Sequence, residues 1–192
     1  MKTNYTLVLL FFISLTTFSQ NKRFSLEVNY PLAMSNGFEN LSGIIDASIN
    51  YRFAKSELFN YGASVTFDYL KGDLRFSNQD LNRNFFFYHV DGFTEMTIPS
   101  AEKLHPFAGA GFTYLDYDYQ YLSGTNEFPT IKTRKEKDLG FNIKLGVQYD
   151  FTNSLFIQAY FHSIRTFNKS DFNNETIGVN YNQLKFGLGI RI

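Results

Sequence analysis

The residues of this sequence that could do chemistry stand in close pairs. His162 and Ser163 are neighbours in "FHSIR", and a histidine in contact with a serine can activate the hydroxyl group as a nucleophile. Adjacent residues of a β-strand point to opposite faces, so a strand at this position keeps the two side chains apart. His89 and Asp91 share a parity, and we expect a structural hydrogen bond between them because buried polar groups normally have partners.

A further pair, Asp116 and Asp118, offers oxygen ligands for a cation. Two carboxylates fall short of the roughly six to eight oxygen ligands that calcium takes. The chain has no cysteine, which excludes disulfides, thiol catalysis and cysteine-based metal sites. It has no phosphate-binding loop, zinc motif or glycine-rich nucleotide fingerprint, and its formal charge of zero gives no reason to expect nucleic-acid binding. We therefore predict no catalysis, no metal and no cofactor.

The elements that must position these residues are strands, because apolar and polar residues alternate along most of the chain. From Leu139 to Phe151 the odd positions are apolar, whereas the even positions hold glycine or polar residues. Seven other stretches show the same period of two. We predict eight strands: Arg23–Leu32, Ile44–Phe53, Leu58–Leu70, Phe85–Ile98, Phe107–Gln120, Leu139–Phe151, Leu155–Phe161 and Gln183–Ile192.

The connections between these stretches alternate between long and short. The short ones are "AKSE", "PSAEKLH" and "TNS", and the long ones include "KGDLRFSNQDLNRN" and "YLSGTNEFPTIKTRKEK". In an up-and-down meander this alternation places every long loop at one end, as in outer-membrane barrels with short periplasmic turns. The charged run Lys132–Asp138 falls in the longest loop, where we expect it to be solvated. Contact with lipopolysaccharide phosphates or a partner is the alternative.

The aromatic residues indicate which face of the strands meets lipid. They collect at the strand ends of the apolar face, around an aliphatic middle, and two such rings match the two interfaces of a bilayer. The polar face holds mainly small and hydrogen-bonding residues, which suit a narrow lumen. We therefore predict that the apolar face points outward. The two rings are Tyr51, Phe53, Phe59, Phe107, Tyr149 and Phe151 near the short turns, and Tyr30, Phe67, Tyr69, Phe86, Tyr88, Tyr117 and Tyr119 at the other end.

The N-terminus has the pattern of an export signal. Lys2 supplies a positive start, and the apolar run Tyr5–Leu15 is shorter than the roughly 20 apolar residues that a membrane-spanning helix needs. Thr17 and Ser19 suit cleavage before Gln20. We therefore predict a signal peptide over residues 1–19 and one barrel domain over residues 20–192.

The chain after the signal resembles the small outer-membrane β-barrel domain proteins of Gram-negative bacteria, within the eight-stranded porin-like superfamily. The resemblance rests on the signal peptide, the eight strands, the run "PFAGAGFTY" from Pro106 to Tyr114 and the apolar last strand. It implies a monomer in the outer membrane that contacts lipid and lipopolysaccharide. It also implies that the last strand holds a signal for the barrel-assembly machinery, formed by Leu184, Phe186, Leu188, Ile190 and Ile192. Such signals usually end in an aromatic residue, whereas this sequence ends in Ile192.

These observations predict an all-β fold, an eight-stranded antiparallel up-and-down transmembrane β-barrel with a structural or surface-interaction role. Side chains should fill the lumen, because a barrel of about eight strands leaves little other room. The alternatives are passage of a small solute and, in a different class, a secreted soluble barrel that binds an apolar ligand. Buried charges need partners, so we expect a luminal network of Glu27, Asp46, Arg52, Asp68, Asp91, Glu95, Lys144, Asp150, Lys185 and Arg191.

Overall fold

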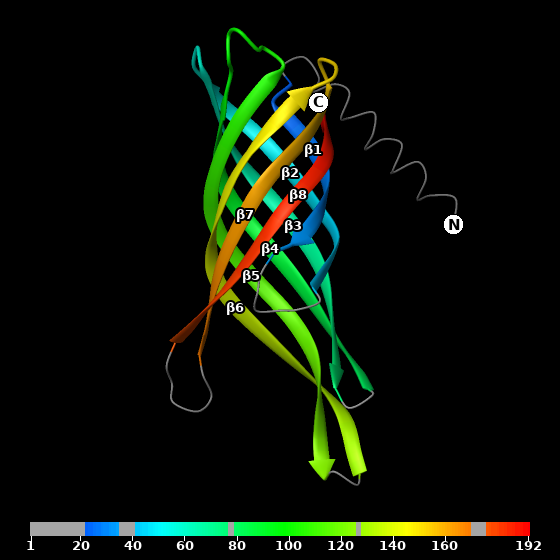
Figure 1. The fold of residues 1–192 in the computed structure, drawn as a ribbon. Coiled ribbons are helices and arrows are strands. Elements are labelled where there is room, and N and C mark those ends of the chain that lie inside the picture. Colours follow the sequence, from blue (N-terminus) through cyan, green and yellow to red (C-terminus); the bar gives the residue numbers. More distant parts are fainter. Residues whose placement is uncertain (1–21, 35–40, 77–78, 126–127, 170–175) are drawn as a thin grey trace, which may run out of the picture.

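Eight antiparallel strands form one closed barrel in the computed structural model of the chain (Figure 1). The structure describes residues 22–34, 41–76, 79–125, 128–169 and 176–192. The predicted signal peptide, residues 1–19, lies outside this part. None of the described residues forms a helix long and apolar enough to cross a membrane. The strands are β1 (Phe24–Ala33), β2 (Leu41–Lys55), β3 (Phe59–Phe76), β4 (Gln79–Met96), β5 (Leu104–Thr125), β6 (Phe128–Asp150), β7 (Leu155–Lys169) and β8 (Thr176–Arg191).

Each strand pairs with its neighbours in the sequence, and β1 and β8 close the ring. In this last ladder Leu26 lies opposite Ile190 and Val28 opposite Leu188. The backbone continues the ladder past the strand end, because the amide of Ile192 donates to the carbonyl oxygen of Phe24 at 2.8 Å. The predicted all-β fold with eight antiparallel strands in sequential order is therefore confirmed.

The apolar face of the strands points out of the barrel, and the polar face points in. Leu145 and Leu188 expose 65% and 64% of their surface, whereas Asp46, Asp68 and Lys185 expose none. A soluble barrel would have the opposite arrangement, since water would cover its polar face. This orientation excludes the secreted barrel with an apolar ligand site and places the leucines against lipid.

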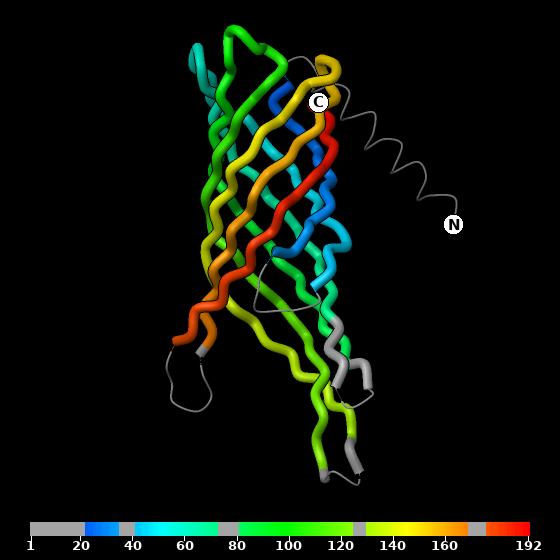
Figure 2. The backbone as a smooth tube through the Cα atoms, in the orientation of Figure 1, coloured from blue at the N-terminus to red at the C-terminus, as the bar shows by residue number. Residues whose placement is uncertain are grey.

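The two ends of the barrel differ in shape. At one end, which we call the short-turn end, residues 56–58, 97–103 and 151–154 connect β2 to β3, β4 to β5 and β6 to β7. At the other end, the long-hairpin end, the hairpin of β5 and β6 reaches furthest beyond the barrel (Figure 2). Pairing of β6 with β7 stops at Leu139 and Phe167, while pairing of β5 with β6 continues to Thr125 and Phe128.

The projecting hairpins correct the prediction of long loops. Lys132–Asp138 was expected in a loop but belongs to β6. Likewise, residues 71–76 belong to β3 and residues 79–84 to β4. The alternation of apolar and polar residues signals a strand only where one face is covered. Both faces of a hairpin outside the bilayer meet water, so its strands lack that signal.

The inside of the barrel also holds an apolar layer that the alternation did not predict. Its members follow the parity of the luminal face and lie between the polar lumen and the long-hairpin end. They seal the lumen at that end. We call this group the apolar seal, and its fully or nearly fully buried members are Leu70, Phe85, Phe87, Leu115, Ile164 and Tyr181.

Strand β5 turns its odd-numbered residues inward, which corrects the placement of three aromatic residues. Tyr117 packs against the apolar seal, and Tyr119 stacks on Tyr117 with ring centroids 6.1 Å apart. Phe107 meets Tyr160 inside the barrel, edge to face, at 5.6 Å. The sequence pattern places these three residues in the outer aromatic rings. The even positions of β5 hold both aromatic residues, Phe112 and Tyr114, and two aspartates, so the sequence does not show which face of this strand is apolar.

Candidate functional site in the polar lumen

A buried ion triad forms the centre of the lumen. The ammonium group of Lys185 on β8 lies 2.6 Å from Asp46 Oδ2 and 2.5 Å from Asp68 Oδ2. Asn29 Nδ2 donates to the other oxygen of Asp46 at 2.6 Å, and the Tyr160 hydroxyl donates to Oδ2 at 3.2 Å. One cation therefore joins β2, β3 and β8 where water is excluded. Loss of the Lys185 charge would leave both carboxylates without compensation.

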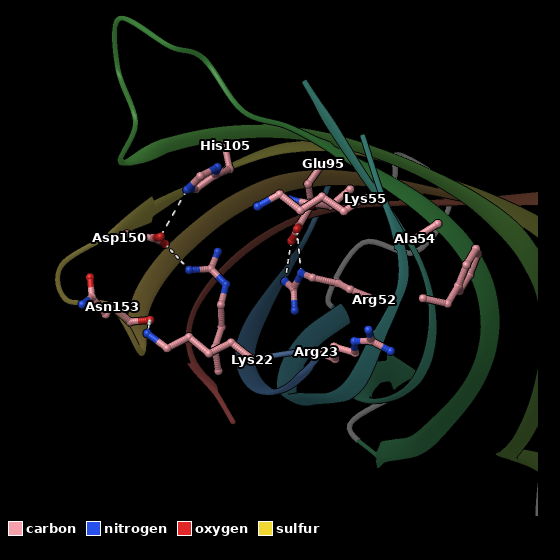
Figure 3. Close-up of a pocket in the computed structure, with 12 residues that line it drawn as sticks. Lys22, Arg23, Arg52, Ala54, Lys55, Glu95, His105, Asp150 and Asn153 are labelled. Carbon is pink, nitrogen blue, oxygen red and sulfur yellow. Dashed lines mark hydrogen bonds and ion pairs between the residues drawn. The ribbon is translucent and has the colours of Figure 1, made fainter. Parts of the chain in front are cut away.

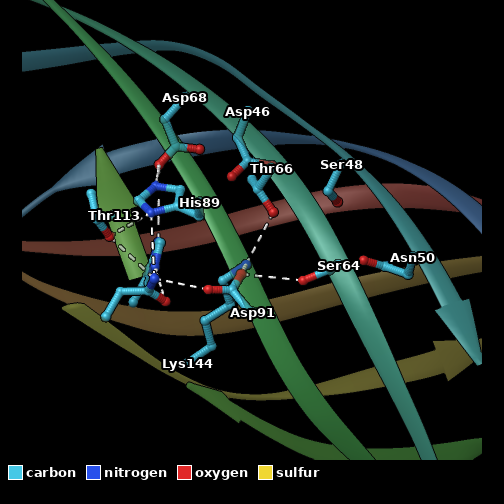
Figure 4. A network of polar contacts seen from close by, with 12 residues as sticks. Asp46, Ser48, Asn50, Ser64, Thr66, Asp68, His89, Asp91, Thr113 and Lys144 are labelled. Carbon is cyan, nitrogen blue, oxygen red and sulfur yellow. Dashed lines mark hydrogen bonds and ion pairs between the residues drawn. The ribbon is translucent and has the colours of Figure 1, made fainter. Parts of the chain in front are cut away.

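Two histidines extend the triad toward β4 and β7. Figure 4 shows the first of them, His89, between Asp68 and Thr113. His89 Nε2 lies 3.3 Å from Asp68 Oδ2, and His89 Nδ1 lies 2.8 Å from Thr113 Oγ1. The expected partner of His89 was Asp91, so this pairing corrects the prediction. The ring of His162 lies 4.7 Å from that of His89, edge to face. The residues in contact come from different strands, so their contacts depend on how the strands are aligned with one another around the barrel.

His162 and Ser163 lie on opposite sides of the barrel wall. His162 is fully buried in the lumen, and its Nε2 contacts Asn142 Oδ1 at 3.1 Å. The Ser163 hydroxyl donates to Asn182 Oδ1 at 2.9 Å. The two side chains therefore do not form the serine–histidine pair that nucleophilic catalysis requires.

Asp68, His89 and His162 bring their ligand atoms within 4.8 Å of one another, close enough to surround a metal ion. Alternation along the chain did not reveal this cluster, because its members stand on three strands. The ammonium group of Lys185 lies 2.5 Å from the carboxylate that such an ion would use. A divalent cation would be repelled by this ammonium at close range. Lysine therefore supplies the positive charge of the cluster, and no metal is needed to neutralise Asp68.

A second ion pair lies next to the triad. Lys144 Nζ approaches Asp91 Oδ2 to 2.5 Å, and the same carboxylate accepts hydrogen bonds from Ser64 at 3.2 Å and from Asn142 at 2.8 Å. A Cβ atom at Gly111 would collide with the carboxylate of Asp91 and with the β4 backbone. The second glycine of the "GAG" run therefore leaves room for this buried pair.

The remaining predicted network residues lie nearer the short-turn end. Arg52 pairs with Glu95 at 2.5 Å, and Arg191 pairs with Asp150 at 2.5 Å. Glu27 has neutral partners instead of a direct ion pair, and it accepts from Ser48 and Gln158 at 3.1 and 2.8 Å as well as from Asn50. Every member of the ten-residue set except Glu27 thus stands in an ion pair, and the pairs link strands that are distant in sequence.

Little free space remains between the polar groups in the middle of the lumen. The pocket inside the lumen has a volume of about 30 Å³ and is lined by Glu27, Lys144, Gln148 and Gln158 among others. A single water molecule needs about 10–15 Å³ by this measure, so the pocket has room for roughly two. Among the described residues, the apolar seal closes the lumen toward the long-hairpin end, which disfavours passage of a solute.

Because side chains fill the lumen, we expect the barrel to conduct few ions across a membrane. The purified monomer in planar lipid bilayers should show no large and stable conductance. Replacement of Phe87 and Leu115 by glycine in one variant should raise the frequency of brief openings, because it opens the apolar seal. The matched control is the same pair of changes at Phe112 and Leu145, which face lipid. Steady channels formed by the wild-type monomer would overturn the filled lumen and support solute passage.

The projecting hairpin is held by its own polar cluster. Glu136 accepts hydrogen bonds from the hydroxyl groups of Tyr117 and Tyr119 and from Asn168, and it pairs with Arg134 at 2.8 Å. Partial burial acts to raise the pKa of Glu136, but these hydrogen bonds and the guanidinium group hold it below its usual range. The cluster fixes the hairpin at its base with an ionised carboxylate.

Asp116 and Asp118, the candidate cation ligands, point to the outer face of β5. They lie opposite Lys137 and Lys135 in the β5–β6 register. Asp118 also accepts a hydrogen bond from Asn84 at 3.0 Å. Neighbouring lysines supply the compensating charge on this surface, which favours a cross-strand charge pattern over a cation site.

Comparison with known proteins identifies the family. The sequence model of one family, described as outer membrane protein beta-barrel domain, matches residues 5–191. The chain belongs to this family. As an outer-membrane barrel it spans the lipid bilayer with its strands, and the polar groups described above form its interior.

Solved structures give the same fold at low sequence identity. The Neisserial surface protein A is 13% identical, with 88% of this chain and 96% of that chain covered and a TM-score of 0.57. A major outer membrane protein from Thermus thermophilus is 10% identical, with 88% and 98% covered and a TM-score of 0.58. The attachment invasion locus protein of Yersinia pestis is 14% identical, with 88% and 96% covered and a TM-score of 0.53. Comparison with curated proteins gave no significant match.

Proposed function

We propose that this outer-membrane barrel is a non-catalytic surface protein that makes contacts outside the cell through the β5–β6 hairpin. The observation that carries the proposal is the edge of β6 over residues 128–138, on the side away from β5. Within the described chain β7 pairs with β6 only as far as Leu139, so this part of β6 has no strand beside it on that side. An unpaired strand edge can accept an extended segment through main-chain hydrogen bonds.

The charge of the edge supports an acidic partner. Between Ile131 and Leu139 the edge strand carries four cations, Lys132, Arg134, Lys135 and Lys137, and two carboxylates, Glu136 and Asp138. Asp116 and Asp118 of β5 lie opposite Lys137 and Lys135, so an acidic partner would compete with these two aspartates for the lysines. Two proteins with similar folds are described as a surface protein and as an attachment invasion locus protein. An acidic protein segment would gain both backbone pairing and charge attraction here, and lipopolysaccharide phosphates would gain the charge attraction alone.

The proposal also includes an assembly signal in β8 and does not include a catalytic role. The outward residues Phe186, Leu188 and Ile190 of β8, with Leu184 and Ile192, form the alternating terminal segment that the barrel-assembly machinery would read. Phe186 exposes 48% and Ile190 42% of its surface, so both remain accessible in the closed barrel. A catalytic role is not proposed, because the one serine–histidine neighbour pair is divided by the barrel wall.

A probe peptide tests the contact surface. A fluorescent peptide of alternating threonine and glutamate should bind saturably to intact cells that express the protein. Lys135→Gln/Lys137→Gln should weaken this binding by about tenfold, since two charge-assisted contacts are lost. Lys22→Gln/Lys55→Gln, which makes the same charge change at the short-turn end, is the matched control. Equal binding by both variants would contradict a role for the hairpin.

Sidedness of the membrane protein is a separate prediction. The chain has no cysteine, so each introduced thiol is unique. Thr133→Cys on the exposed hairpin should react with a membrane-impermeant maleimide on intact cells, whereas Asn153→Cys in the short β6–β7 turn should react only after the outer membrane is permeabilised. Labelling of Asn153→Cys alone on intact cells would invert this topology.

A further inference from the structure

A cavity of about 550 Å³ opens at the short-turn end, and the ion pairs Arg52–Glu95 and Arg191–Asp150 form part of its lining (Figure 3). Its volume lies within the range of roughly 300–1,000 Å³ that is typical of ligand pockets. Five cationic side chains and two carboxylates line it: Lys22, Arg23, Arg52, Lys55 and Arg191, with Glu95 and Asp150. This end of the molecule has no part in the proposed surface function, so the inference below stands independently of that function.

The two carboxylates are already neutralised by neighbours in the cavity. Glu95 receives two hydrogen bonds from the guanidinium group of Arg52, and Asp150 receives one from Arg191 and contacts His105 at 3.1 Å. The other three cations, Lys22, Arg23 and Lys55, have no acidic partner among the described residues. Three positive charges therefore remain uncompensated around one concave space.

Two irregularities of the backbone turn lysines toward this space. The β2–β3 register shifts between Arg52 and Ala54, so that Lys55 lies opposite Asn60. Without this bulge Lys55 would keep the outward parity of Tyr51 and Phe53 and would face lipid. A β-bulge that redirects a side chain is a recurrent feature of binding sites at barrel rims.

Lys22 carries the second irregularity. Its φ of 45° lies in the left-handed region, which is uncommon for a residue with a side chain. Its ammonium group reaches across the mouth to the β6–β7 turn and donates to the carbonyl oxygen of Asn153 at 2.7 Å. This partner is neutral, so the positive charge of Lys22 is positioned but not cancelled.

We propose that this cavity binds a phosphate-bearing anion. Lysine and arginine without counterions are the side chains that recognise phosphate oxygens, arginine through its planar fork and lysine as a compact charge. Phe53 lines the same cavity and exposes 57% of its surface, so the site borders the lipid-facing wall. The phosphate group can therefore belong to an anionic lipid headgroup of the adjacent leaflet or to a soluble phosphate ester.

The test uses pyrophosphate as the probe and protein purified from outer membranes in a phosphate-free detergent. Isothermal titration should show saturable binding that weakens steeply as salt is added. Lys22→Gln/Lys55→Gln should weaken it by at least about tenfold, because two charge-assisted bonds are lost. Lys71→Gln/Arg165→Gln, an equal change of charge at two exposed residues of β3 and β7 outside the cavity and the hairpin, should bind as the wild type does. Circular dichroism checks that both variants keep their strand content.

Bilayer nanodiscs distinguish the two sources of phosphate. If phosphatidylglycerol weakens pyrophosphate binding relative to phosphatidylcholine, the site takes a lipid headgroup. If both lipids allow equal binding, the site takes a soluble phosphate compound. Absence of saturable binding by the wild type, or equal loss in both double variants, would overturn the proposal.

Discussion

Lys185→Met should lower the free energy of unfolding by about 3–5 kcal/mol, the cost of removing one partner from a buried ion pair. The methionine side chain is close in length to that of lysine, so the change removes the charge with little loss of volume. Asp46 and Asp68 would then face each other in a lumen where neither is exposed to water. Urea unfolding in lipid vesicles, followed by circular dichroism, measures the effect.

A double variant shows whether the charge or the packing is responsible. Lys185→Met/Asp68→Asn should regain about 1–2 kcal/mol of the loss, because one of the two uncompensated carboxylates has been removed. Lys55→Met, at an exposed lysine without an acidic partner, should change stability by less than about 0.5 kcal/mol. If the double variant were as unstable as the sum of its single changes, the triad would have no energetic coupling.

Leu145→Arg should cost about 2–4 kcal/mol of stability, the usual penalty for arginine at the middle of the bilayer. Leu145 stands halfway along the lipid-facing row from Leu139 to Phe151 and exposes 65% of its surface. The same substitution at Leu139, which exposes 69% and lies beside the projecting hairpin, should cost only about 0–1 kcal/mol. Unfolding titrations in vesicles compare the two variants directly.

Leu139 and Leu145 are exposed to nearly the same extent, so packing cannot explain a difference between the stabilities of the two variants. Such a difference would come from the depth of each residue in the lipid. An independent measurement places a fluorophore at Val147 through a unique cysteine. A quencher attached to lipid chains should reach it, and a water-soluble quencher should not. Equal costs at Leu139 and Leu145 would contradict the assignment of the bilayer midplane.

The sequence predicted those parts of the fold where one face of a strand meets lipid and the other meets polar groups. Leu139–Phe151 shows this, because its outward and inward residues differ at almost every position. The extent of the strands was not predicted where the lipid-facing and lumen-facing residues no longer differ in polarity. The run Lys132–Asp138 is β-strand, yet both of its faces lie outside the bilayer and carry charge.

Residues of the apolar seal were missed for the opposite reason. Phe85 and Phe87 alternate with Phe86 and Tyr88, so both faces of β4 are aromatic and the inward face gives no polar signal. The parity of a residue shows which face of a strand it occupies, but it does not show which residue of another strand it contacts in the lumen. That Lys185 contacts Asp46 and Asp68 depends on the stagger of β2, β3 and β8 around the ring, and one sequence contains no measure of that stagger.

The ladder between β1 and β8 has a consequence for how the chain folds. Leu26 and Ile190 are neighbours in the barrel although they stand near opposite ends of the polypeptide. Contacts of such high sequence separation form slowly, because the entropy of closing the intervening loop must be overcome first. The ring cannot close until β8 is available to pair with β1, and until then both strands present open edges. The unfinished chain therefore needs protection from aggregation during its passage to the membrane.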